Sequence, residues 1–124
     1  MIMSSYRLAN LIGKQALEKK ASEINVVDLR KLSEVTDYFV ICSADVEIHA
    51  KAIADHIIES LKKKGIRLWH KEGYQNSKWI LLDYVDVVVH IFLRATREFY
   101  GLERLWGDAK IKEIKPESKL PRKK

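Results

Sequence analysis

The sequence predicts a single α/β (α+β) domain in which helices flank a five-stranded mixed sheet. Its 124 residues suffice for one hydrophobic core and are too few for two ordinary domains. Hydrophobic residues make up 47% of the chain, a share that can bury a core and that is not typical of disordered chains. The patterns run helix, two strands, helix, three strands, helix, an order that a mixed sheet with packed helices satisfies.

Three segments show the apolar spacing of amphipathic helices. The first covers residues 4–20. The second carries the longest apolar stripe, from Val46 to Leu61, with Ser43 as its expected N-cap and Gly65 at its end. The third covers Thr96–Trp106. The apolar face of each of these helices must be buried, and packing on a sheet would bury it.

Five short apolar or β-branched segments predict the strands of that sheet. They cover residues 24–29, 37–42, 66–71, 78–83 and 87–93. The second is apolar almost throughout, which is typical of a central strand covered on both faces. The link between the last two strands has only three residues, 84–86, so these strands are expected to form an antiparallel hairpin.

The net charge of +6 is concentrated near the C-terminal end. Residues 107–124 hold seven Lys or Arg and three Asp or Glu, together with two prolines and little apolar content. We therefore expect a folded domain over residues 1–106 and a basic, mobile tail over residues 107–124. The tail either contacts a polyanion such as RNA or only keeps the protein soluble, and charge alone favours neither.

The sequence predicts a cytoplasmic protein with no membrane partner. It has no apolar run approaching the ~20 residues of a membrane span. The N-terminal residues lack the pattern of a secretory signal and the arginine-rich pattern of an organelle import sequence. Cys42 is the single cysteine, which excludes an internal disulfide and fits a reducing compartment.

No familiar pattern of catalytic or metal-binding residues is present. His49 and His56 share a predicted helix but lie ~10 Å apart along its axis, too far to share a metal ion. Cys42 falls inside an apolar strand, and Asp83 and Asp86 flank a turn that attracts aspartate for local hydrogen bonds. Glycine-rich phosphate loops and a nucleophile elbow are also missing. We expect no catalytic residues, no metal and no cofactor.

The predicted hairpin carries one mixed face. Because side chains alternate along a strand, Trp79, Leu81 and Asp83 share a face, and His90 of the next strand can join them. A partly exposed tryptophan beside charge is typical of a binding anchor. Alternatively, a helix of the same domain covers Trp79, and the alternation does not distinguish these two arrangements.

Several segments together resemble the ribosomal silencing factor family (RsfS, also called Iojap-like). The similarity extends from about Leu8 to Trp106, and its segments are Asp37–Ile41, Glu72-Gly73, Trp79–Tyr84, Asp86–Phe92 and Arg97–Trp106. The closing Tyr-x-Leu-Glu-x-Leu-Trp is the most specific of them. The resemblance implies a mixed sheet with the shape of a nucleotidyltransferase but without the catalytic carboxylates of those enzymes. The chain likewise lacks a Gly-Ser pair before an Asp-x-Asp.

The resemblance also implies a function in translation. Members of the family bind the large ribosomal subunit through its ribosomal protein fourteen, block joining of the small subunit and repress translation when nutrients are limiting. Their organelle relatives are implicated in assembly of the large subunit. Three functions therefore stay open: silencing, large-subunit assembly and a cryptic nucleotidyltransferase-like activity. The chain can be a monomer or a weak homodimer, since an exposed hairpin edge can pair with itself.

The family's partner-binding surface maps onto residues of the predicted hairpin and its surroundings. They are Glu72, Trp79, Asp83 and Tyr84, with His90 nearby. Arg97 and Tyr100 match a second region, for which a structural role and a further partner contact are both open. The chain departs from the family at Val85, where glycine is usual. Glycine suggests a turn position that tolerates a positive φ, which valine disfavours, so the turn is expected to differ locally from that of the family.

Overall fold

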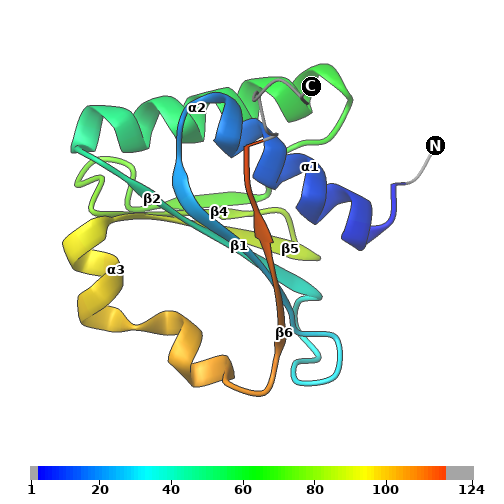
Figure 1. The fold of residues 1–124 in the computed structure, drawn as a ribbon. Helices are drawn as coiled ribbons and strands as arrows, with labels where there is room; N and C mark the ends of the chain where they lie inside the picture. Colours follow the sequence, from blue (N-terminus) through cyan, green and yellow to red (C-terminus); the bar gives the residue numbers. More distant parts are fainter. Residues whose placement is uncertain (1–2, 117–124) are drawn as a thin grey trace, which may run out of the picture.

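The computed structural model describes residues 3–116, and in them six strands form one mixed sheet with helices on both faces (Figure 1). The elements are α1 (Ser5–Glu18), β1 (Ser22–Asp28), β2 (Tyr38–Ala44), α2 (Glu47–Lys63), β3 (His70–Glu72), β4 (Trp79–Asp83), β5 (Val87–Leu93), α3 (Arg94–Tyr100), the 3-10 helix η1 (Leu102–Trp106) and β6 (Lys110–Ile114). The strand order is β3-β4-β5-β2-β1-β6. No helix in this range is long and apolar enough to cross a membrane.

The two central strands pair in parallel, and their neighbours pair antiparallel. Val40 of β2 lies opposite Val89 of β5, and β4 and β5 form the predicted antiparallel hairpin. Helices α1 and α2 cover one face of the sheet, while α3 and η1 lie on the other (Figure 1). The prediction that residues 37–42 form a central strand covered on both faces is confirmed, because nearly every residue of β2 is buried.

The prediction that Ser43 caps the second helix is wrong. Strand β2 continues through Ala44, which pairs with Leu93, so Ser43 is a buried strand residue. Helix α2 begins at Glu47, and the side chain of Val46 at the cap position makes no capping hydrogen bond. The far end is as predicted, because the chain turns at Gly65 with a φ of +80°.

The predicted helix over residues 96–106 is divided in two. Helix α3 ends at Gly101, which adopts a left-handed conformation with a φ of +54°, and η1 then continues in a new direction. The predicted stripe therefore breaks: Phe99 is 78% exposed, whereas Leu102 and Trp106 pack on the sheet. Glycine permits this break because it has no Cβ to clash in the left-handed region.

The expected strand count of five is corrected to six. The additional strand, β6, pairs antiparallel with β1 and places Ile114 opposite Ile24. Ile114 packs against α1 so closely that a Cβ at Gly13 would collide with its side chain. The expectation of a mobile tail is thus wrong for residues 110–114, while residues 117–124 lie outside the described range. The lysines that alternate along this strand protect an edge strand from aggregation, but they also make the segment polar, so the sequence did not predict a strand there.

Candidate docking surface on the open face of the sheet

The face of the sheet that carries α3 and η1 is only partly covered. A small cluster of buried residues lies beneath these helices, namely Val27, Leu29, Ile41 and Phe92. Trp106 of η1 packs on the rim of this cluster, with its ring edge-on to Phe39 at a centroid distance of 6.0 Å. Beyond Trp106 the sheet is uncovered, and a groove of about 790 Å³ lies there.

The lining of this groove is mainly apolar. Phe39, Leu81 and Val88 line it from three neighbouring strands, β2, β4 and β5. Trp69 and Val35 line it from loops, and their side chains are 71% and 86% exposed. Large apolar side chains exposed together on a soluble domain commonly mark a surface that docks a macromolecule.

His90 also lines the groove and is held neutral. The indole Nε1 of Trp79 donates a hydrogen bond to His90 Nδ1 over 3.0 Å, so the ring proton lies on Nε2. Burial lowers the pKa of His90 to about 4, because a charged imidazole loses its hydration there. Nε2 is buried and has no hydrogen-bond partner among the described residues. At neutral pH the His90 ring is therefore uncharged, and its Nε2–H donates to none of the described residues.

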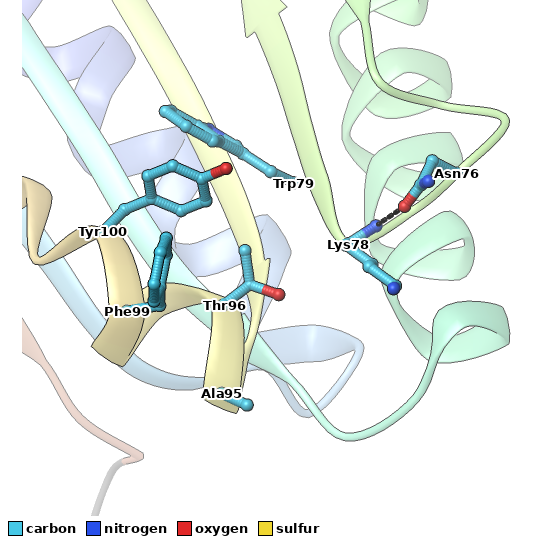
Figure 2. A pocket seen from close by; sticks show the side chains of 7 residues that line it. All are labelled: Asn76, Lys78, Trp79, Ala95, Thr96, Phe99 and Tyr100. Carbon is cyan, nitrogen blue, oxygen red and sulfur yellow. Dashed lines mark hydrogen bonds between the residues drawn. The ribbon is translucent and has the colours of Figure 1, made fainter.

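Trp79 is partly covered by α3, the second of the two arrangements that the sequence left open. Its ring lies 4.9 Å from that of Tyr100 and 4.8 Å from that of Phe92, measured between centroids. Figure 2 shows the Tyr100 and Trp79 rings side by side at a second hollow, of about 640 Å³, with Phe99 beside Tyr100. Trp79 thus links the helix to the sheet and borders this second hollow.

The acidic residues predicted for the site lie at the β3–β4 edge of the open face. His70 pairs with Asp83 and Glu72 pairs with Leu81, so these four side chains share one face of the sheet. Glu72 is exposed and contacts His70 Nε2 at 2.7 Å. One oxygen of Asp83 accepts a hydrogen bond from the amide of Val85 over 2.7 Å. The groove consequently has negative charge along one rim.

Tyr84 is the predicted site residue that the structure places elsewhere. Its side chain is buried in the core on the helix-covered face, and burial raises its pKa to about 12. The parity of the strand explains this position, because Tyr84 follows Asp83 directly and so faces the opposite side. Tyr84 supports the hairpin from within and is not part of the groove.

Most of the groove lining was not predicted from the sequence, including its two most exposed apolar residues, Trp69 and Val35. Trp69 was assigned to a strand over residues 66–71, but β3 begins only at His70, so Trp69 lies in the preceding loop. Val35 belongs to the polar connection between β1 and β2, and a single valine in a polar segment does not predict a binding surface. A signal for Trp69 was present, since the cations Arg67 and Lys71 lie two residues to either side of it in the sequence.

The described residues bear on two kinds of chemistry, metal binding and nucleophilic catalysis by a cysteine. Among residues 3–116, no group of three or more His, Cys, Asp or Glu side chains lies close enough to hold a metal ion. Cys42 is fully buried, and burial raises the pKa of its thiol to about 12, which suppresses the nucleophilic thiolate.

Comparison with known proteins gives the family. Residues 3–124 match the family described as "Ribosomal silencing factor during starvation". The chain belongs to the ribosomal silencing factor family. The resemblance seen in the sequence is thereby confirmed.

Individual relatives agree with this assignment. The ribosomal silencing factor RsfS of Halalkalibacterium halodurans is 36% identical over 112 residues, which cover 90% of this chain and 96% of the relative. A crystal structure from Chromobacterium violaceum has a TM-score of 0.82 and 29% identity and covers 98% of each chain. The mouse protein named "Mitochondrial assembly of ribosomal large subunit protein 1" is 32% identical over 92 residues, 72% of this chain and 40% of that protein.

The closing segment of the family resemblance has a clear structural role. Arg97 makes two hydrogen bonds to the carboxylate of Glu103, at 3.2 and 2.7 Å. It also donates to Ser43 Oγ at 2.8 Å and to the carbonyl of Glu23 at 2.7 Å. Asn25 donates to the same Glu103 carboxylate over 2.6 Å. Arg97 thus fastens the α3–η1 bend to β1 and β2, whereas Tyr100 remains half-exposed.

Proposed function

We propose that the protein docks on the large ribosomal subunit through the groove, with ribosomal protein fourteen as its contact, and so blocks joining of the small subunit. The observation that carries the proposal is the exposed apolar groove between Trp69 and Trp106 in a member of the silencing factor family. Such a factor acts by occupying space on the joining surface. No chemical step is needed, and the bacterial silencing factors among the protein's relatives favour action in the cytoplasm.

The groove has the composition of a protein-docking site. Trp69 supplies a large exposed aromatic surface, and burial of such a side chain at the centre of an interface commonly contributes about 2 kcal/mol or more. Leu81 and Val88 provide an apolar floor. The acidic rim, Glu72 and Asp83, favours a partner with Lys or Arg around an apolar projection, since complementary charge fixes orientation and speeds association.

Co-sedimentation with separated ribosomal subunits tests the proposal directly. The protein should pellet with large subunits and not with small ones, and added small subunits should then form fewer joined ribosomes. Failure to pellet with either subunit would refute the docking. A nucleotide screen with Mg²⁺ would then test the nucleotidyltransferase-like alternative.

Two variants locate the contact. Trp69→Ala should weaken pelleting at least tenfold and leave the fold intact, because the side chain is mostly exposed. Glu72→Lys should slow association by reversing a rim charge without disturbing the Asp83 turn. Phe99→Ala is the matched control, since Phe99 is an equally exposed aromatic that lines the other hollow. Equal losses for Trp69→Ala and Phe99→Ala would exclude the groove as the contact.

Assembly of the large subunit is the second candidate. The name of the mouse relative favours it, and assembly requires the same docking. Pelleting with large subunits that leaves subunit joining unchanged would support assembly and refute silencing.

A further inference from the structure

A second surface of opposite charge lies where α1, β6 and the C-terminal end of α2 meet. It is a hollow of about 460 Å³ whose polar lining comprises Arg7, Lys14, Lys64, Lys112, Tyr6 and Asn10. We call this surface the basic hollow. It is lined by four cations and no acidic residue.

The fold brings these residues together from distant parts of the chain. Arg7, Asn10 and Lys14 are spaced by three and four residues, so they lie along one face of α1. Helix α1 runs beside β6 (Figure 1). Lys112 pairs with Val26, a residue of the helix-covered core, and so its side chain points to the same side as α1. Lys64 comes from the C-terminal cap of α2.

The positive charge of the hollow is not neutralised by the described part of the protein. Among residues 3–116, none of its four cations makes an ion pair. Lys112 Nζ is held instead by neutral oxygens, Asn10 Oδ1 at 2.8 Å and the Tyr6 hydroxyl at 3.4 Å. Asn10 is itself oriented by donating to the Tyr6 carbonyl over 2.8 Å. These contacts position the ammonium group while leaving its charge available to an anion.

We infer that the basic hollow binds the phosphodiester backbone of RNA. Four cations spread over one surface match a row of phosphates better than a single small anion, and the hydroxyl of Tyr6 can donate to phosphate or sugar oxygens. A lipid surface would also attract the charge, but binding there is strengthened by apolar side chains that insert. The apolar residues of the hollow, Met3 and Leu11, pack instead against the protein's own core.

The basic hollow is separate from the docking groove. The groove lies over β2, β4 and β5 on the open face, whereas the hollow lies at the β6 edge on the helix-covered face. Both surfaces can therefore be occupied together, and a factor docked through the groove can still hold RNA. The inference goes beyond the proposed docking and does not require it.

Salt-dependent binding of the full-length chain to a labelled short RNA duplex tests the inference. Each cation that neutralises a phosphate contributes about 0.7–0.9 to the slope of log affinity against log salt. The variant Arg7→Gln/Lys14→Gln/Lys64→Gln/Lys112→Gln should therefore lose about three units of slope. The variant Arg7→Lys/Lys14→Arg/Lys64→Arg/Lys112→Arg, which keeps all four charges, should retain the slope of the parent. Thermal melting of each variant confirms that it is folded.

A charge-matched control separates a defined site from diffuse attraction. Lys31→Gln/Arg67→Gln/Lys71→Gln/Lys78→Gln removes four exposed cations outside the hollow, and its slope should stay close to that of the parent. If the two fourfold variants lost equal amounts of salt slope, the attraction would be diffuse and the basic hollow would not be a defined RNA site.

Two further measurements identify the partner and separate this inference from the docking proposal. Vesicles of equal parts phosphatidylserine and phosphatidylcholine report lipid binding. If the hollow variant lost vesicle binding but kept its RNA slope, the RNA assignment would be refuted. Trp69→Ala should bind the RNA duplex like the parent while pelleting with large subunits at least tenfold more weakly, so the two proposals succeed or fail independently.

Discussion

Replacing Val85 by glycine should stabilise the protein. Val85 has a φ of +75° in the turn between β4 and β5. The turn is closed on both sides of it: the amide of Asp86 donates to the Tyr84 carbonyl over 3.0 Å, and the amide of Val85 donates to Asp83 Oδ1 over 2.7 Å. These bonds keep a β-branched residue in a conformation that suits glycine. Val85 thus adopts the positive φ that the family's usual glycine suggests and that valine disfavours.

The size of the effect follows from two opposing terms. A left-handed conformation costs a residue with a Cβ about 1–2 kcal/mol. The glycine variant recovers this cost, but its unfolded chain has more conformational entropy, which lowers the gain in stability by about 0.5–1 kcal/mol. Val85 is 54% exposed, so removing its side chain sacrifices little apolar burial. The free energy of unfolding of Val85→Gly should rise by about 1 kcal/mol, or about 4 °C in Tm for a domain of this size.

Urea denaturation of the parent, Val85→Gly and Val85→Ala measures this difference. Alanine removes the β-branch but keeps a Cβ, so its stability should fall between those of the parent and the glycine variant. If Val85→Gly were no more stable than the parent, the positive φ of Val85 would not destabilise the native protein, and the prediction would be refuted. Because Val85 also lines the groove, the same variant should change ribosome docking only modestly.

Three further predictions concern buried groups. Arg97→Met should lower the free energy of unfolding by about 2 kcal/mol. The loss is smaller than for a fully buried ion pair because Glu103 keeps some solvent contact. Equal stability of the variant and the parent in urea denaturation would contradict this. The pKa of His90 is lowered from 6.5 to about 4. Between these pH values the unfolded chain binds a proton at His90 that the native protein does not. The free energy of unfolding should therefore fall by up to about 3 kcal/mol as the pH drops from 6.5 to 4. A His90→Gln variant should lack this part of the pH dependence, and an unchanged profile would refute it. Burial raises the pKa of Cys42 to about 12, so iodoacetamide should label it only as fast as the protein unfolds; rapid labelling of native protein would show the thiol to be accessible.

The sequence predicts the β4–β5 hairpin well because alternation is a local property. Trp79, Asp83 and His90 were expected on one face and lie on one face. The same argument separates Tyr84 from them, although the family resemblance grouped all four. Parity along a strand is therefore a more reliable guide to a shared surface than membership of one motif.

Features that depend on pairing between distant segments were not predictable in the same way. Strand β6 has mostly exposed residues, and it forms because β1 offers an unpaired edge and α1 offers Gly13 as a site for Ile114. The bend at Gly101 likewise depends on where Leu102 and Trp106 can be buried. Neither the groove nor the basic hollow has a local signal, since each combines residues from three or more elements.

In the proposed docking, the most specific family segment has an indirect role. Arg97 and Glu103 contact no groove residue in their hydrogen bonds, yet they fix η1 over β1 and β2, and η1 carries Trp106 at the groove wall. Arg97→Met should therefore weaken docking even under conditions where the variant is fully folded. Restoring docking by Arg97→Lys would be incomplete, because an ammonium group cannot reproduce the two parallel bonds of a guanidinium to Glu103. A folded Arg97→Met variant that docks like the parent would show that Trp106 holds its place without the ion pair, and that the groove is shaped by apolar packing alone.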